Sequence, residues 1–396
     1  MQRRFPPEFL FGTSTAAAQI ETADGHDWQG VRARDGHIFE RTTDHEQRLR
    51  QDAEIISSLA PAYRMSVAWN RLQRGPMEDF DPVVVAEYTG FLEDLRARNV
   101  SIMMVLHHFT NPRWFAERGG WEKASNIAYF VDFGKKVVQT FGRFVSHWNT
   151  FNEPNVYVSY GWLTGFFPPF KINPLLAFRV LRNLGQAHAR MYAEIKRLYP
   201  DHPVGISHNA VIFDAENILG HIPAGLADWW FMEHAPSYFK EMDFFGMSYY
   251  ARVTHDPLPV TFIDTPEKIK RYGLPHDDMW EYHPQGLRTC IDRYWRQFGK
   301  PIIITENGVC DERDVLRQQA ILEYAEIIHQ ALTDGIDIRG YYWWSTWDNF
   351  EWHLGPTRRF GLYACNLETR ERTPRRSAEL YSALAHSRTI PASLTA

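Results

Sequence analysis

The chain has 396 residues, of which 44% are hydrophobic and 23% charged, and its formal net charge is −5. The net charge is negative and lysine and arginine form no stripe along the chain, which argues against a nucleic-acid partner. No apolar run is long enough to span a membrane. Because Pro6, Pro7 and Glu8 follow the first arginines, no signal-peptide core is expected, and we predict a cytoplasmic protein.

Short runs rich in β-branched and aromatic residues predict eight β-strands. Helical patterns separate these runs, as in Pro82–Arg98 and Arg313–Thr333, and Asp81 is placed to cap the first of these helices. In chain order, the predicted strands are Phe9–Ala17, Ala62–Trp69, Ser101–Phe109, Ser146–Asn152, Pro203–Asn209, Asp243–Tyr250, Pro301–Glu306 and Ile338–Trp347.

The alternation of strands and helices predicts parallel strands, and eight such units can close into a barrel. We therefore predict an α/β fold in which residues 1–396 form a single (β/α)8 TIM barrel as one catalytic domain. An open doubly wound sheet is the alternative fold, but no GxGxxG motif follows the first predicted strand.

Polar and aromatic residues end most of the predicted strands. Because the active site of a barrel lies at the C-terminal ends of its strands, we expect these side chains to share one pocket. They are Gln19, Asn70, His107, His108, Asn152, Glu153, His208, Asn209, Tyr249, Tyr250, Glu306, Asn307, Trp347 and Asp348.

Two of these residues suggest a reaction. Glu153, in TFNEPN, ends the fourth strand, and Glu306, in ITENG, ends the seventh. In a closed barrel these strands face each other across the lumen, so the two carboxyl groups can flank a bound sugar. Glycosidic bonds are cleaved by such a pair, one acting as an acid at the leaving oxygen and the other at the anomeric carbon.

The chain resembles glycoside hydrolase family 1, from FPPEFLFGTSTAAAQIE near the start to RFGLYACNLETRERTPRRSAELY near the end. The resemblance implies that Glu153 is the acid/base and Glu306 the nucleophile of a retaining mechanism. It also implies that Arg64 and Tyr250 support the nucleophile and that Asn152 holds the sugar 2-hydroxyl.

The resemblance further implies a set of residues that holds the glycone. Glu351, in WDNFEWHLG, can bind the 4- and 6-hydroxyls but would repel a 6-phosphate, so phosphorylated substrates are disfavoured despite Arg358 and Arg359 nearby. The complete set is Gln19, His108, Trp344, Glu351, Trp352 and Phe360.

No metal site or cofactor is expected. His107 and His108 are adjacent on a strand, so their side chains point to opposite faces and only His108 should enter the pocket. No HExxH motif accompanies them, and the three cysteines, Cys290, Cys310 and Cys365, lack CxxC spacing and are expected to be reduced thiols.

Four positions depart from the family pattern, with Ala18 for tyrosine, Thr22 for glycine, Phe109 for tryptophan and Ser248 for asparagine. Phe109 lacks the indole N–H that could reach a 3-hydroxyl. Ser248 is smaller than asparagine and is expected to leave a gap filled by water. The chain also looks shorter than typical members, which implies trimmed loops and a shallower entrance suited to bulky or varied aglycones.

We predict a retaining, exo-acting β-glycosidase, foremost a β-glucosidase, that cleaves a small carbohydrate or an aryl or alkyl glycoside. The choice among glucose, galactose and fucose stays open.

An endo-acting glycosidase, a transglycosidase and a sugar-binding protein that has lost catalysis are the alternatives. Glu351 and Trp352 would close the pocket, which disfavours an endo-acting glycosidase. Glu153 and Glu306 are intact, which argues against a sugar-binding protein that has lost catalysis. The aromatic residues of the long loops are suited either to the barrel mouth or to a contact between the subunits of a homo-oligomer.

Overall fold

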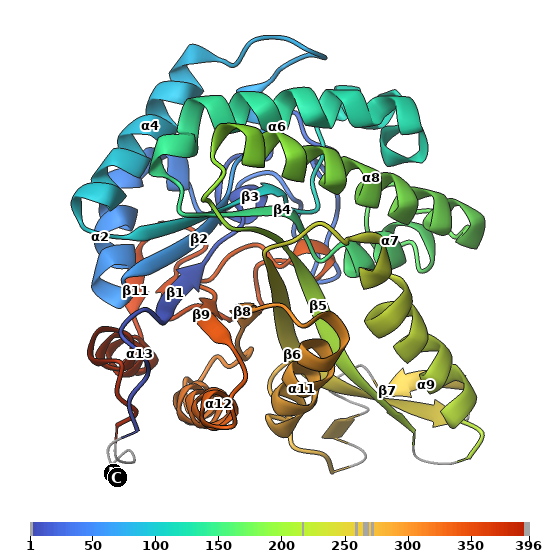
Figure 1. Cartoon of the computed structure of the whole chain (residues 1–396), viewed down its shortest axis with the longest axis vertical. Coiled ribbons are helices and arrows are strands. Elements are labelled where there is room, and N and C mark those ends of the chain that lie inside the picture. Colours follow the sequence, from blue (N-terminus) through green and yellow to red (C-terminus); the bar gives the residue numbers. More distant parts are fainter. Residues whose placement is uncertain (1–2, 216–217, 258–259, 264–268, 271–272, 392–396) are drawn as a thin grey trace.

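The computed structural model describes residues 3–215, 218–257, 260–263, 269–270 and 273–391. Within this part of the chain, eight parallel strands close into a barrel (Figure 1), because β5 pairs with both β4 and β6. Around the ring, the strands are β1 (Leu10–Ser14), β2 (Ala62–Ser66), β3 (Ser101–His107), β4 (His147–Asn152), β5 (Val204–Ala215), β6 (Phe244–Pro257), β8 (Ile302–Asn307) and β9 (Ile338–Trp344). The predicted barrel is confirmed.

The predicted strand ends were wrong in places. The first, second, third and last strands end two to three residues earlier than expected, so Gln19 lies on α1 (Ala17–Ile20) rather than at a strand end. β5 and β6 instead continue past the barrel and pair through Ala215 and His255. The antiparallel strand β7 (Val260–Ile263) and the hairpin of β10 (Tyr363–Cys365) and β11 (Arg372–Pro374) were not predicted, because three or four residues give too little alternation to recognise.

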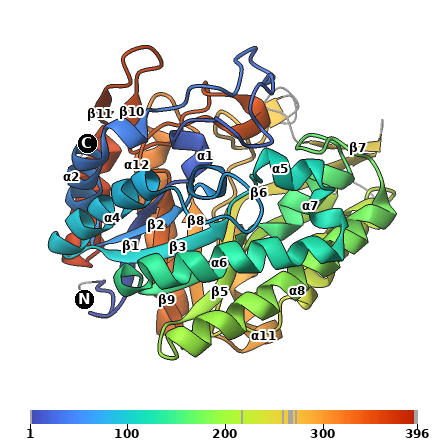
Figure 2. The same cartoon turned by 90° about the horizontal axis from the view of Figure 1, so that it is seen from above.

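Helices surround the strands (Figures 1 and 2), namely α2 (Leu49–Leu59), α4 (Pro82–Ala97), α6 (Ile127–Phe141), α8 (Pro174–Leu198), α11 (Gln285–Phe298), α12 (Leu316–Thr333) and α13 (Arg376–Ser387). The predicted cap of α4 is confirmed, since Asp81 accepts hydrogen bonds from the backbone N–H of Val83 at 2.9 Å and of Val84 at 3.4 Å. Shorter helices follow the strands or lie in the loops, namely α3 (Trp69–Leu72), α5 (Arg113–Glu117), α7 (Pro154–Trp162) and α9 (His221–Asp228).

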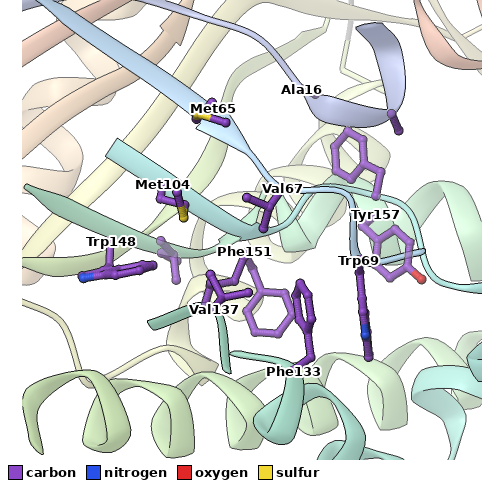
Figure 3. Packing of buried hydrophobic residues seen from close by; sticks show 14 of the residues in the cluster. Ala16, Met65, Val67, Trp69, Met104, Phe133, Val137, Trp148, Phe151 and Tyr157 are labelled. Atoms are coloured by element: carbon purple, nitrogen blue, oxygen red, sulfur yellow. The ribbon is translucent and has the colours of Figure 1, made fainter. Parts of the chain in front are cut away.

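The apolar core has an outer and an inner part. Between strands and helices, Phe133 and Val137 of α6 belong to the same buried cluster as Met104 and Phe151 of the strands (Figure 3). A second, small cluster comes from strands alone and includes Ala62, Met103, Phe244, Ile303 and Tyr342.

The inner cluster forms the floor beneath the polar residues. Ala62 and Arg64 are two residues apart on β2 and so share a face, which puts Arg64 one layer nearer the C-terminal end. Gly12 makes room for Tyr342, because a Cβ at Gly12 would lie 2.3 Å from the tyrosine ring. A filled, buried floor therefore lies beneath the polar site.

The three cysteines are buried and form no disulfide. Among the helices that the structure describes, none combines the length and apolar character needed to cross a bilayer.

Candidate active site

Glu153 and Glu306 reach the same pocket from different strands. Glu306 is the fifth residue of β8, and Glu153 follows β4 and is the N-cap residue of α7. The backbone of Glu153 has a φ of 40°, in the left-handed region, and is held there by its own N–H, which donates to Ser207 at 2.7 Å. A non-glycine residue in this conformation costs energy that the surrounding structure must offset, and such residues concentrate at functional sites.

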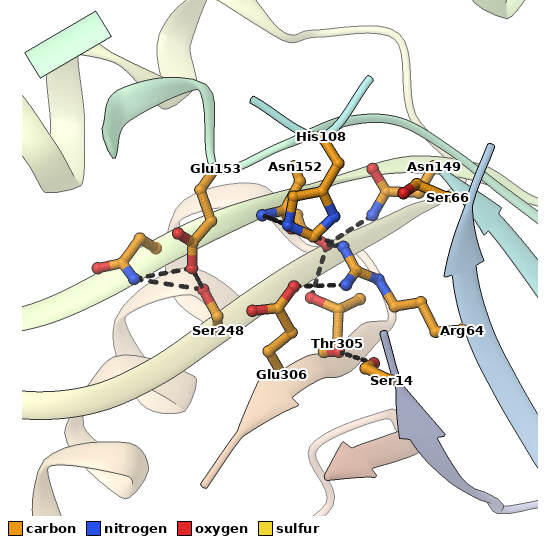
Figure 4. A network of polar contacts seen from close by, with 12 residues as sticks. Ser14, Arg64, Ser66, His108, Asn149, Asn152, Glu153, Ser248, Thr305 and Glu306 are labelled. Atoms are coloured by element: carbon orange, nitrogen blue, oxygen red, sulfur yellow. Dashed lines mark hydrogen bonds and ion pairs between the residues drawn. The ribbon is translucent and has the colours of Figure 1, made fainter. Parts of the chain in front are cut away.

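The carboxylate of Glu306 accepts two strong hydrogen bonds. Arg64 Nη1 donates at 2.5 Å to Oε1 (Figure 4), and the Tyr250 hydroxyl donates at 2.8 Å to Oε2. Burial raises the pKa of Glu306, and the charge and hydrogen bonds of Arg64 and Tyr250 oppose that rise. The sequence prediction that these two residues contact Glu306 is confirmed.

Arg64 is itself fully buried and held on three sides. Besides Glu306, it donates through Nη2 to Asn152 at 2.6 Å and to Ser207 at 2.9 Å. Ser207 in turn donates to the Thr305 hydroxyl at 2.7 Å. Side chains from β4, β5 and β8 thus fix the guanidinium that β2 carries, which explains why it can stay buried and charged.

Glu153 has neutral partners instead. Its Oε1 accepts a hydrogen bond from Asn209 at 2.8 Å and another from the hydroxyl of Ser248. Burial, followed by the charge of Glu306, raises the pKa of Glu153 to about 7, although these hydrogen bonds and Arg64 act in the opposite direction. The expectation of a water-filled gap at Ser248 was wrong, because the Ser248 hydroxyl donates a hydrogen bond directly to the carboxyl group of Glu153.

The protonation of His108 follows from its neighbours. Asn152 accepts from Arg64 through Oδ1, so its Nδ2 must donate to His108 Nε2, 2.9 Å away. His108 Nε2 is then an acceptor, and burial together with Arg64 keeps the pKa of the imidazole far below its usual value. The proton sits on Nδ1, which is buried without a protein partner and free to donate to a ligand.

Gln19 and Glu351 form a second polar group in the pocket. Gln19 Nε2 donates to Glu351 at 3.2 Å, to Asn349 at 3.0 Å and to the Phe350 carbonyl at 2.9 Å. Its Oε1 is buried without a protein partner. Burial, with the charges of Glu306 and Glu153, raises the pKa of Glu351 to about 8. Gln19 therefore offers an acceptor and His108 a donor, and a sugar hydroxyl can use both.

Aromatic rings wall the pocket. The His108 ring lies 6.0 Å from Trp344 and 5.9 Å from Trp352, and Phe109 packs edge-on to Trp352 at 5.1 Å. Across the site, Tyr250 lies 5.2 Å from Trp280 and 6.1 Å from Phe360. Trp280 was missed from the sequence, because it lies in the long connection between β6 and β8, where no strand pattern assigns a direction to its side chain.

Several strand-end residues do not reach the pocket. His107 bonds Asn111 at 3.1 Å and packs against Trp121, which confirms that only His108 of the pair faces inward. Asn70 donates to the backbone of Asp24, and His208 contacts the backbone of Phe231. Trp347 bonds Thr43, and Asp348 pairs with Arg375. In the described ranges, no three His, Cys, Asp or Glu side chains gather as metal ligands would.

Comparisons with known proteins agree with this geometry. A β-glucosidase of Agrobacterium sp. is 29% identical, with 96% of this chain and 95% of that protein covered. A β-galactosidase of Pyrococcus woesei is 28% identical, with 94% of both chains covered. Among solved structures, a β-glycosidase from Pyrococcus horikoshii superposes with a TM-score of 0.86 at 32% identity, covering 99% of this chain and 97% of that one.

The sequence model of glycosyl hydrolase family 1 matches residues 1–215 and 233–390, nearly the whole chain. The resemblance drawn from the TFNEPN and ITENG motifs is thereby confirmed. The barrel, the paired carboxyl groups and these relatives together identify a glycoside hydrolase that acts on β-glycosides of carbohydrates, and the chain belongs to glycosyl hydrolase family 1.

Proposed function

We propose that the protein is a retaining, exo-acting β-glycosidase in which Glu306 is the nucleophile and Glu153 the acid/base. The observation that carries this proposal is the difference between the two carboxyl groups. Glu306 faces a guanidinium and a phenol, while Glu153 has only neutral donors and a pKa of about 7. One group is thereby kept ready to attack and the other ready to release a proton at neutral pH.

In the first step, Glu306 attacks the anomeric carbon while Glu153 protonates the departing glycosidic oxygen. The bond to the aglycone breaks as the bond between the sugar and Glu306 forms. Tyr250 and Arg64 hold the attacking carboxylate in place. Asn152, anchored by Arg64 and His108, keeps a second N–H for the 2-hydroxyl, where a hydrogen bond strengthens as charge develops.

In the second step, Glu153, now ionised, takes a proton from water. The resulting hydroxide attacks the anomeric carbon and releases Glu306, so the sugar leaves with its original configuration. While Glu306 is bonded to the sugar it carries no charge, so the pKa of Glu153 is lower and Glu153 can act as a base. Once Glu306 is released as a carboxylate, its negative charge raises the pKa of Glu153 again and keeps that group protonated for the next cycle.

We propose that the glycone is a β-D-glucosyl residue, with β-galactosides and β-fucosides as further substrates. Gln19 and Glu351 would hold the 4- and 6-hydroxyls, and His108 would donate to the 3-hydroxyl in the absence of an indole at Phe109. Trp344, Trp352 and Phe360 would enclose the ring. A pocket walled in this way admits one terminal sugar, which supports cleavage from the non-reducing end.

The stereochemical course tests this proposal. We would follow hydrolysis of p-nitrophenyl β-glucoside, β-galactoside and β-fucoside by proton NMR and identify the first anomer released. The β-anomer is expected from each substrate that is cleaved, with the glucoside fastest. An α-anomer formed first would show inversion and remove the nucleophilic role of Glu306.

A further inference from the structure

A cavity of about 290 Å³ lies beside the catalytic pocket but is not lined by Glu153 or Glu306. Its wall comes from three stretches far apart in the sequence, which are residues 37–43, residues 348–359 and residues 365–370. Asn349 and Phe350 line the cavity and also accept hydrogen bonds from Gln19 of the catalytic pocket. Nothing in the proposed reaction uses it.

Arg370 is the unusual residue of this cavity. It is 8% exposed, yet its Nε has no hydrogen-bond partner, and it takes part in no ion pair within the described part of the chain. Burial and the neighbouring Arg41 lower the pKa of its guanidinium. The nearby carboxylate of Asp44 already accepts hydrogen bonds from Arg41. The shorter of the two bonds from Arg41 Nε measures 3.0 Å. Arginines this buried are normally paired, since an uncompensated charge is costly.

Two other residues that line the cavity also have a buried N–H donor without a hydrogen-bond partner. Arg359 Nη1 is buried without a hydrogen bond and lies 3.7 Å from Asp348, whose oxygens already accept from Arg375 at 2.7 and 3.0 Å. Asn349 Nδ2 is also buried without a partner. All three buried, unpartnered atoms of this wall are N–H donors, and none is an acceptor.

We propose that this cavity binds a small oxyanion, either a phosphate or a carboxylate group, through Arg370, Arg359 and Asn349. A sugar or a cation would need acceptors as well as donors, whereas an oxyanion supplies only acceptors. Of the charged residues of the wall, Arg41 pairs with Asp44 and Asp348 pairs with Arg375, which leaves Arg359 and Arg370 against the exposed Glu368. The remaining charge is positive and suits an anionic ligand.

The site is connected to the catalytic pocket by one side chain. Asn349, which lines the cavity, accepts a hydrogen bond from Gln19 through Oδ1 at 3.0 Å, and its Nδ2 is buried without a partner. An oxyanion bound to Nδ2 fixes the orientation of the amide and therefore of the acceptor that Gln19 uses. The oxyanion is thus a second ligand that steadies a residue of the proposed glycone site.

The test measures binding directly and does not depend on catalysis. Sodium phosphate and sodium malonate are titrated separately into the full-length protein by isothermal calorimetry, with sodium chloride holding the ionic strength constant. Saturable binding of one ion per chain is expected for at least one of them. Phosphate alone would assign a phosphate site, and malonate alone a carboxylate site. If neither binds saturably, the proposal is overturned.

Substitutions locate the site. Arg370→Gln is expected to weaken binding by about tenfold or more, since charged hydrogen bonds are lost. Arg339→Gln, which removes an exposed arginine paired with Asp337, should leave it unchanged. Unaltered binding in the Arg370→Gln protein would refute the assignment, and Arg359→Gln repeats the test if that variant does not fold.

Thermal unfolding without either oxyanion separates a binding residue from a structural one. Removing an unpaired buried charge should leave the Tm of the Arg370→Gln protein equal to or above that of the wild type. Arg372→Gln, which breaks a buried pair with Asp52 at 2.8 Å, should lower it. Equal losses in both variants would make Arg370 a structural residue and overturn the proposal.

Discussion

Glu306 and Glu153 are the same residue type, both buried, at the same end of one barrel, but the protein surrounds them differently. Glu306 lies against Arg64, which also donates to side chains of β4 and β5, and accepts a hydrogen bond from Tyr250. Glu153 lies against Asn209 and Ser248, which carry no charge, and feels Glu306 as a neighbouring negative charge. Burial alone raises both pKa values, and only the cation offsets it strongly at Glu306.

The neighbouring residues, more than the carboxyl groups themselves, therefore assign the roles of nucleophile and acid/base. This difference in surroundings also predicts the pH dependence. The active form needs Glu306 ionised and Glu153 protonated, so kcat/KM should fall as pH rises through the Glu153 pKa of about 7. It should fall again below the pKa of Glu306. Substitutions at four of these residues test this contrast, and their expected effects decrease from Glu306 through Glu153 and Arg64 to Ser248.

Glu306→Ala should abolish hydrolysis of every β-glycoside, with a loss in kcat of about 10⁴-fold or more. No other group in the pocket is placed to attack the anomeric carbon, so the loss should not depend on the leaving group. Initial rates on p-nitrophenyl β-glucoside measure it, with Glu379→Ala, an exposed residue of α13, as the control. Activity within tenfold of wild type would contradict the assignment.

Glu153→Ala should reduce the rate on poor leaving groups by about 10²- to 10⁴-fold, the usual contribution of general acid–base catalysis. With 2,4-dinitrophenyl β-glucoside the leaving oxygen needs no proton, so the first step should be nearly unaffected. Comparing pre-steady-state bursts on this substrate with steady-state rates on methyl β-glucoside measures the split. Equal losses on the two substrates would deny Glu153 the acid role.

Arg64→Met should reduce kcat by about 10²-fold, as loss of a buried electrostatic partner does. Without the cation the pKa of Glu306 rises, so the acidic limb of the kcat/KM profile moves to higher pH. Stability should also fall by about 3–5 kcal/mol, because a buried carboxylate is left unpaired.

A matched control for Arg64→Met is Arg317→Met, which breaks another fully buried arginine pair, with Asp314 on the outer side of the barrel. That variant should lose stability without moving the acidic limb. If both variants leave the limb in place, Arg64 does not control the ionisation of Glu306.

Ser248→Ala should have the smallest effect, less than about tenfold in kcat/KM at pH 7. The Ser248 hydroxyl stabilises the ionised form of Glu153, so losing it raises that pKa and shifts the basic limb to higher pH. A pH–rate profile from pH 5 to 9 measures the shift, and Ser248→Asn, which restores a donor, should reverse it. A basic limb that moves to lower pH would show that the bond acts on the protonated form.

The sequence supported correct predictions for local and topological features. Short runs of β-branched and aromatic residues that alternate with helical patterns predicted the barrel, and residues that follow parallel strands had to meet at one end. Glu306, Asn152 and Tyr250 lie on or beside strands, where the direction of a side chain is set by its position, and each was found in the pocket. The confirmed contacts of Arg64 and Tyr250 with Glu306 had depended on family resemblance as well.

The sequence by itself determined the strand and helix order, the family and the two carboxyl groups, because these depend on periodicity and on short motifs. The hydrogen bond of Ser248 to Glu153, the place of Trp280 beside Tyr250 and the unpaired guanidinium of Arg370 were decided only by the tertiary structure. Each of these depends on distances between residues tens to hundreds of positions apart. No local pattern encodes such distances, since loops follow no period and burial is a property of the whole fold.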